Sequence, residues 1–376
     1  MNKKDIQPTL TLMTCGTSLI TNGIDSELRS IINRCANAVN WTDISSSDTA
    51  TLKSHFKEKE KQFLASNEQE IRRLSAELNG LLAWQEENPV ANSQLQNEYW
   101  IIATDTILGK TTAKIIQEWL SLHGYRTQVL SESGLRTANL IEFRQALSAL
   151  TKHIVESVTG YRDNGYQINF NLTGGFKGIN GFLQALATVY ANQTYYLFEG
   201  STELLYIPQL PYRLDATQII TENLTAFRRL ANGMSISQAQ AQSSTIPDIW
   251  LFDIDSSTML SEWGELIWLD TMPKLYQQQV LPSPSNLVIY SNSFLNTTKK
   301  ADASLIEIIN KRIDALAVYA ESGYKQMLKS LDVKALQANQ YRDKGILECD
   351  LDAHHRLFMT RDGEHITILK LHAALH

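Results

Sequence analysis

The first half of the chain alternates short apolar runs with longer segments of helical periodicity. Strands are predicted at 9–14, 99–106, 126–131, 167–173, 194–200 and 203–210, and helices at 111–123, 140–158 and 179–191. Short glycine-containing links join these segments, which predicts a doubly wound α/β domain with a mainly parallel sheet. Between the first two strands, residues 25–80 carry apolar positions at helical spacing, so we expect a helical insert there.

The pattern changes from about residue 216 onward. Helical positions, a polar stretch and a strand-like segment lead to an expected helix over 261–276, a layout that resembles a winged-helix unit. The last section predicts a helix over 304–331 and then strands near 345–351, 355–360 and 365–372, with Asp362 and Gly363 as a hairpin signal. We therefore expect three parts: an α/β domain over 1–215, a connector over 216–299 and a small α+β domain over 300–376.

Composition limits the classes of function. The chain has 376 residues, 43% of them hydrophobic and 20% charged, with a formal net charge of -6. Such a protein does not coat nucleic acid through a large basic surface, so any RNA contact must be local. Three cysteines without a CxxC pair predict neither a disulfide framework nor a cysteine zinc site. With no apolar run near Met1 long enough for a signal peptide or a membrane span, we expect a cytoplasmic protein without membrane contact.

Small polar residues and glycines gather where the expected strands end. Backbone N–H groups in such loops approach phosphates closely, and a lysine adds positive charge. Tight turns alone also favour these residue types, but three loops that meet at one sheet edge favour a phosphate- or nucleotide-binding face. Neither GxxxxGK[ST] nor GxGxxG is present, which argues against an ATPase or a dinucleotide-dependent dehydrogenase. The candidate ligand-binding residues are Gly16, Thr17, Ser18, Asp105, Thr106, Thr173, Gly174, Gly175, Phe176 and Lys177.

Two of these loops, CGTSL after the first strand and NLTGGFKG before a helix, resemble the CARF domains of type III CRISPR accessory proteins. The resemblance covers about residues 8–212. It implies a homodimer that binds a cyclic oligoadenylate, either cyclic tetra-adenylate or cyclic hexa-adenylate, as an allosteric activator across its two-fold axis. In that family the serine and lysine of these motifs contact the phosphate ring, and in some members they promote its slow cleavage. The matching positions here are Ser18 and Lys177, so the resemblance also implies slow ring cleavage by this chain. The long helical insert departs from the family.

The C-terminal section concentrates histidine, since five of the eight histidines lie in the last 23 residues, with arginines and lysines nearby. The absence of an HExxH pair or cysteine partners argues against a metal site. Histidine and arginine on a small sheet suit metal-free RNA cleavage: a base takes the 2′-hydroxyl proton, a cation stabilises the phosphorane and an acid protonates the leaving oxygen. For any single histidine, a solvated sheet face is the simpler interpretation.

The segment GILECDLDAHHRLFMTRDGEHITILKLHAALH resembles the closing meander of RelE/HigB/YoeB-like toxins, with a similarity over about residues 304–376. The resemblance implies a metal-independent mRNA interferase without a cofactor, which cuts mRNA on the ribosome. Some members carry lysines where this chain has Glu348, Asp350 and Asp352, so the general base stays open between an acidic residue and a histidine. The candidate catalytic residues are Arg356, His355, His372, His376 and Lys344.

Together, the two resemblances predict a CRISPR-associated endoribonuclease that a cyclic oligoadenylate activates and that acts with ribosome and mRNA. The alternative is a CARF-family transcription regulator that binds DNA through the connector. Residues 248–276 carry six acidic residues against the single Lys274, which argues against DNA binding. A stand-alone ring nuclease would leave the histidine-rich terminus without a role.

Overall fold

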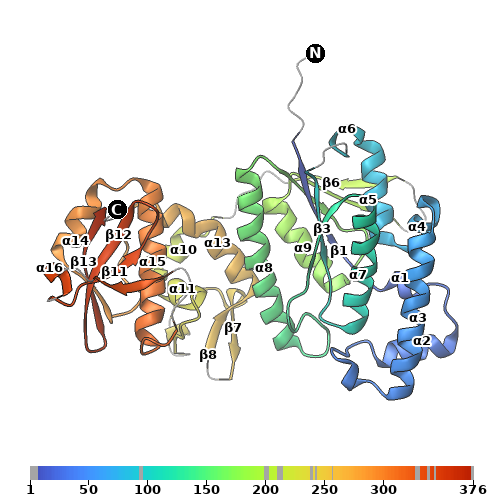
Figure 1. Cartoon of the computed structure of the whole chain (residues 1–376), viewed down its shortest axis with the longest axis horizontal. Helices are drawn as coiled ribbons and strands as arrows, with labels where there is room; N and C mark the ends of the chain where they lie inside the picture. The colour runs from blue at the N-terminus through green and yellow to red at the C-terminus, as the bar shows by residue number, and fades with distance from the viewer. Residues whose placement is uncertain are drawn as a thin grey trace, which may run out of the picture. The chain divides into compact units, whose positions relative to one another are not determined.

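The computed structural model describes residues 7–92, 96–198, 203–209, 215–237, 240–241, 244–255, 257–326, 331–336, 339–342 and 344–373. They form two compact units, Met1–Arg213 and Leu214–His376, shown in Figure 1. The second unit contains both the expected connector and the expected C-terminal domain.

The first unit is built on a six-stranded sheet in the order β3-β2-β1-β4-β5-β6. All neighbouring strands pair in parallel except β6, which runs antiparallel to β5. The predicted α/β class with a mainly parallel, Rossmann-like sheet is therefore confirmed. All six residues of the central strand β1 are buried, as expected for a strand covered on both faces. The strands are β1 (Thr9–Thr14), β2 (Glu98–Ile102), β3 (Arg126–Leu130), β4 (Gln167–Asn171), β5 (Gln193–Leu197) and β6 (Leu204–Ile207).

Helices cover both faces of this sheet, with α8 (Leu140–Asp163) and α9 (Lys177–Tyr190) on one side and α7 (Ile107–Leu122) on the other (Figure 1). Helix α7 begins at Ile107, earlier than predicted, because the Thr106 hydroxyl caps it by accepting the Gly109 N–H at 3.1 Å. The predicted insert is helical and packs on the α7 side, sharing a core with that helix. It comprises α1 (Ser18–Thr21), α2 (Ser26–Arg34), η1 (Trp41–Asp43), α3 (Ser46–Ala65), α4 (Glu68–Leu74), α5 (Ala76–Glu87) and α6 (Pro89–Asn92).

The second unit contains a five-stranded sheet in the order β10-β11-β12-β13-β9, antiparallel except for the β13–β9 pair. Helix α15 (Ala303–Glu321) contributes Ile309 and Ile313 to a core that includes Leu357 and Ile368 of the sheet. This helix ends at Glu321 rather than at residue 331, because Gly323 adopts a left-handed φ of 64° that stops it. The strands are β9 (Val288–Tyr290), β10 (Val333–Ala335), β11 (Leu347–Asp350), β12 (His355–Asp362) and β13 (His365–Ala373), with α14 (Asn292–Thr297), η3 (Thr298–Lys300) and α16 (Asn339–Arg342) beside them in sequence.

The expected connector folds as helices, a β-hairpin and a further helix. The helix predicted over 261–276 is confirmed as α13 (Glu262–Tyr276), which Ser261 caps by accepting the Gly264 N–H at 3.2 Å. Strand β9 lies within residues 216–299, the range expected for the connector, but it pairs with β13 of the C-terminal sheet, so the two segments share one sheet. The remaining elements are α10 (Thr217–Glu222), α11 (Leu224–Ala231), η2 (Asp248–Trp250), β7 (Leu251–Ile254) and β8 (Ser257–Leu260).

A buried ion pair joins α11 to α15. The side chains of Arg228 and Asp314 are only 1% and 4% exposed, and Arg228 Nε donates to Asp314 Oδ1 at 2.8 Å. The Tyr276 hydroxyl donates to the second carboxylate oxygen. Burial lowers the pKa of Arg228, but the charge and hydrogen bond of Asp314 together with Tyr276 and Tyr290 outweigh it, so this pKa lies above its usual value and the guanidinium stays protonated. Removal of one partner would leave the other charge buried without compensation.

We expect Arg228→Met to destabilise the second unit by about 3–5 kcal/mol, the usual cost of breaking a buried pair from one side. Lys311→Met is the matched control on α15, because it removes the Glu307 ion pair, whose lysine is half exposed, and should cost at most about 1 kcal/mol. Hydrogen exchange of α15 peptides in the full-length chain measures both opening free energies. Equal effects of the two substitutions would contradict the role of the buried pair.

Candidate functional site

A cavity of about 370 Å³ lies where β1, β2 and β4 end, and several predicted residues line it. Strands β1 and β4 are the neighbours at which the strand order of the sheet reverses, which is the usual ligand position of this fold. Residues of the helical insert and of the loop after β3 complete the lining. The predicted residues among the lining are Gly16, Thr17, Thr106, Gly175, Phe176 and Lys177.

The loop after β1 is held by a carboxylate from the insert. Glu77 of α5 is 1% exposed, and its Oε1 accepts the Gly16 N–H at 2.7 Å while its Oε2 accepts the Ser75 hydroxyl at 2.8 Å. The same carboxylate packs against the loop after β4, since a Cβ on Gly174 would lie 2.5 Å from it. An insert residue that no motif identified therefore fixes the spacing of two predicted loops.

The glycines of the loop after β4 are required by close backbone contacts. The Thr14 hydroxyl donates to the Gly174 carbonyl at 2.6 Å, and Asn180 Nδ2 donates to the same oxygen at 2.8 Å. Gly175 has a left-handed φ of 97°, and a Cβ there would lie 2.3 Å from the Thr14 side chain. This turn places Lys177 at the first position of α9.

The amino terminus of α9 is open to a ligand. Its N-cap residue, Phe176, supplies no side-chain hydrogen bond, and N–H groups in a first helical turn lack intrahelical acceptors and carry partial positive charge. Lys177 is exposed and forms no ion pair with any residue that the structure describes. The helix terminus and this lysine line the cavity and are chemically suited to an anionic ligand.

Asp105 does not line the cavity but positions a residue that does. Its carboxylate accepts hydrogen bonds from Lys110, from the Gly134 N–H at 2.9 Å and from Arg136 Nη1 at 3.1 Å. Burial would raise the pKa of Asp105, but these hydrogen bonds and the two cations hold it below its usual value. Arg136, which lines the cavity, also pairs with Glu142 at 2.6 Å. The sequence analysis did not identify Arg136, because the loop after β3 matches no motif. The only indication in the sequence was an arginine in a loop that follows a parallel strand.

The structure places the remaining predicted residues of this group behind the cavity surface. The Thr173 hydroxyl accepts the Leu197 N–H at 3.1 Å and so ties the loop after β4 to β5. Ser18 begins α1, and its hydroxyl is buried without a hydrogen-bond partner in the described structure. Ser18, Asp105, Thr173 and Gly174 are not lining residues of the cavity.

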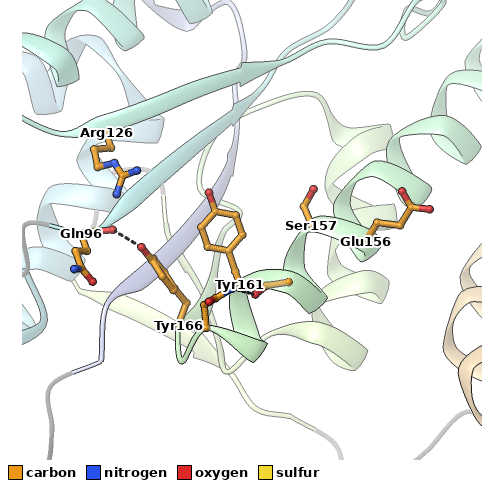
Figure 2. Close-up of a pocket in the computed structure, with 8 residues that line it drawn as sticks. Gln96, Arg126, Glu156, Ser157, Tyr161 and Tyr166 are labelled. Carbon is orange, nitrogen blue, oxygen red and sulfur yellow. Dashed lines mark hydrogen bonds between the residues drawn. The ribbon is translucent and has the colours of Figure 1, made fainter. Parts of the chain in front are cut away.

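A second cavity, of about 550 Å³, lies at the opposite edge of the same sheet (Figure 2). Arg126 at the start of β3 pairs with Glu98 at 2.9 Å, and the Tyr166 hydroxyl donates to the Gln96 carbonyl at 3.2 Å. The last turn of α8, at Gly160 and Tyr161, lines this cavity, and the carboxyl end of a helix disfavours anions. The strand-end cavity is therefore the better candidate for a phosphate ligand.

One face of the second unit's sheet brings together part of the predicted catalytic set. In register, Arg356 of β12 lies opposite Asp350 of β11 and His372 of β13. Because side chains alternate along strands, Glu348, Phe358 and Lys370 share this face. We call these six residues the polar sheet face.

The contacts of Arg356 and His372 define the chemistry of the polar sheet face. Arg356 Nε pairs with Asp350 Oδ1 at 2.6 Å, and its Nη1 donates to the Asp352 and His355 carbonyls at 2.5 and 2.9 Å. The His372 ring stacks on Phe358 with centroids 4.6 Å apart, and its Nδ1 lies 2.6 Å from the Ala373 carbonyl oxygen. A carbonyl oxygen only accepts hydrogen bonds, so Nδ1 carries the proton and Nε2 of the neutral ring can accept one.

The other predicted catalytic residues lie elsewhere. His355 points into a local turn, where its Nδ1 lies 3.0 Å from both carboxylate oxygens of Asp352. Burial would raise the pKa of Asp352, but hydrogen bonds from His354 and His355 hold it below its usual value. Lys344 precedes β11 at the end that pairs with Met359, away from Arg356. His376 lies outside the described residues.

No group of three or more histidine, cysteine, aspartate or glutamate side chains that the structure describes is arranged to hold a metal ion. Likewise, none of the described helices is long and apolar enough to cross a membrane.

The fold and the strand-end cavity together define a Rossmann-like domain with a candidate ligand pocket. Residues 72–210 match a family described as CRISPR-associated protein (Cas_APE2256). Over a little more than a third of its length, the chain is therefore similar to CRISPR-associated proteins. The matching segment includes Arg136 and Lys177 but neither the loop after β1 nor the second unit. No curated protein matches the chain.

We expect Glu77→Ala to release the loop after β1. The Gly16 N–H would lose its acceptor, and leaving such a partly buried donor unpaired costs about 1–3 kcal/mol, which corresponds to roughly 5- to 150-fold faster amide exchange at Gly16. Glu86→Ala on the same helix removes only an exposed pair with Arg72 and serves as the control. Unchanged exchange at Gly16 in Glu77→Ala would show that this carboxylate does not hold the loop.

Proposed function

We propose that the chain is a two-part effector of type III CRISPR defence. The first unit binds a cyclic oligoadenylate, and this ligand activates metal-independent RNA cleavage by the second unit. One observation supports ligand binding by the first unit: the open amino terminus of α9 and Lys177 line a cavity that three strand-end loops share. The similarity of residues 72–210 to CRISPR-associated proteins supports this ligand class.

The size of the cavity supports a homodimer. At about 370 Å³, it lies near the lower end of the roughly 300–1,000 Å³ typical of small-molecule pockets. A ring of four or six adenylates therefore needs a second binding surface. In the proposed dimer, a two-fold axis beside the cavity supplies the same loops from the partner chain to the other half of the ring. Because Ser18 is not among the lining residues and its hydroxyl is buried, the proposal gives it no role in ring cleavage.

The polar sheet face supports the cleavage half. We assign His372 Nε2 as the base that takes the 2′-hydroxyl proton, with Glu348 as the acidic alternative on the same face. The 2′-oxygen then bonds to phosphorus, the bond between phosphorus and the 5′-oxygen breaks, and the leaving 5′-oxygen takes a proton from water, which gives a 2′,3′-cyclic phosphate and a 5′-hydroxyl end. Arg356 stabilises the phosphorane through Nη2, since its Nε and Nη1 are engaged by Asp350 and two carbonyls.

We further propose that the ribosome presents the mRNA substrate. The chain carries a net charge of -6, so it lacks the broad basic surface that would hold free RNA. A ribosome that orients the mRNA would remove the need for such a surface. The transcription-regulator alternative gains no support from the fold: the hairpin β7–β8 carries Asp253, and residues 244–273 contain no lysine or arginine, whereas a DNA-binding wing needs cations.

Lys177→Ala should weaken the binding of cyclic tetra-adenylate about 10- to 100-fold, because it deletes a charge-assisted contact to phosphate. Isothermal titration calorimetry on the full-length chain measures this change. Lys114→Ala, an exposed lysine of α7 outside the cavity lining, should bind like wild type. If the Lys177→Ala chain keeps wild-type affinity, the ligand groove lies elsewhere.

Arg356→Ala and His372→Ala should each slow ribosome-dependent mRNA cleavage by about 10²-fold or more, the usual effect of losing a transition-state contact. Their affinity for cyclic tetra-adenylate should not change, because the polar sheet face lies outside the first unit. Lys344→Ala is the matched control, since the sheet register separates this lysine from Arg356. Wild-type cleavage rates in both test variants would refute the assignment of the polar sheet face and favour the regulator alternative.

A further inference from the structure

The strand-end cavity contains side chains that phosphate binding does not require. Asn33 of α2 and Asn37 in the segment after it come from the helical insert, and Thr137 comes from the loop after β3. None of the three lies in a motif, and none is positively charged. Two amides and a hydroxyl in one cavity suggest a second part of the ligand that offers hydrogen-bond donors and acceptors rather than charge.

Hydrogen bonds fix the part of the insert that lines the cavity to the rest of the first unit. The Ile107 N–H donates to the Ala38 carbonyl at 2.9 Å, and the Thr137 hydroxyl donates to Asn37 Oδ1 at 3.1 Å. Behind the wall, Ile32 and Cys35 are buried in the core shared with α7. The backbone that carries Asn33 and Asn37 is therefore held in place before any ligand arrives, which lowers the entropic cost of recognition.

The two amides differ in what they can still bind. Asn37 Oδ1 already accepts from Thr137, so its Nδ2 offers the remaining donors. The Asn33 side chain forms no hydrogen bond with a described residue, which leaves one donor and one acceptor side by side. This pair matches the N7 acceptor and N6 donor of adenine, whereas guanine and hypoxanthine offer two acceptors on the same edge.

We propose that Asn33 and Asn37 recognise an adenine base of the bound ligand, so that the insert sets base specificity while α9 and Lys177 hold a phosphate. Asn33 contacts N6 and N7 of the base, and Asn37 Nδ2 donates a further hydrogen bond to the same nucleotide. This inference rests on the proposed function, because it assumes that the strand-end cavity is the oligoadenylate site.

Calorimetry with two ring probes tests the inference on the full-length chain. Cyclic tetra-adenylate and cyclic tetra-inosinate carry the same phosphate ring and differ only at their bases. Wild type should prefer the adenine ring by about tenfold or more, the usual discrimination of one bidentate base contact. Asn33→Ala should lose most of this preference by weakening adenine binding alone, and Asn37→Ala should weaken adenine binding less. Asn22→Ala, an exposed asparagine of the insert outside the cavity lining, should keep the full preference.

The outcomes separate this inference from the proposed function. Equal binding of the two rings by wild type, or an unchanged preference in Asn33→Ala, overturns base recognition and leaves the phosphate site standing. Weaker binding of both rings by Asn33→Ala also overturns it, since that result indicates a structural role. Failure of wild type to bind either ring overturns both the inference and the proposed ligand class.

Discussion

The buried carboxylate of Glu77 is the contact on which the candidate ligand site depends. This carboxylate accepts the Gly16 N–H from one strand-end loop and packs against Gly174 of another. The backbone carbonyl of Glu77 also accepts a hydrogen bond from Asn171 Nδ2 at 2.9 Å. A buried charge is tolerated only where hydrogen bonds compensate it, and the Gly16 N–H and the Ser75 hydroxyl supply them. The insert is thus part of the site: it spaces the loops through Glu77 and forms a cavity wall through Asn33.

In the second unit, the equivalent constraint is that a shared strand and a buried ion pair join the connector to the C-terminal domain. Strand β9 extends the sheet beside β13, and Arg228 of α11 reaches Asp314 of α15 in the core. Because close-packed cores deform little, the polar sheet face and the connector helices should move together as one body. A ligand signal that reaches the connector would then also reach the residues proposed to cut RNA.

The sequence was sufficient for the features that depend on neighbouring residues. Short apolar runs next to glycines located the parallel strands, and the TGGFK run located Lys177 at a helix start. Contacts between distant segments were not visible: Gly16 and Glu77 are 61 positions apart, and Asp105, which pairs with Arg136 beside the cavity, is 31 positions from it. Lys344 was grouped with Arg356 by sequence proximity, but the pairing of β11 with β12 places it toward the other end. Helical periodicity continued past Glu321, whereas the left-handed Gly323 ended the helix.

Ligand-dependent cleavage by the wild-type chain is the most direct test of the proposed mechanism. The full-length protein would be incubated with translating ribosomes and labelled mRNA, with and without cyclic tetra-adenylate or cyclic hexa-adenylate, and the RNA ends would be analysed. The proposed function predicts cleavage only when one of the rings is present, with 2′,3′-cyclic phosphate and 5′-hydroxyl ends. Intact mRNA under every condition, or cleavage at the same rate without a ring, would contradict it.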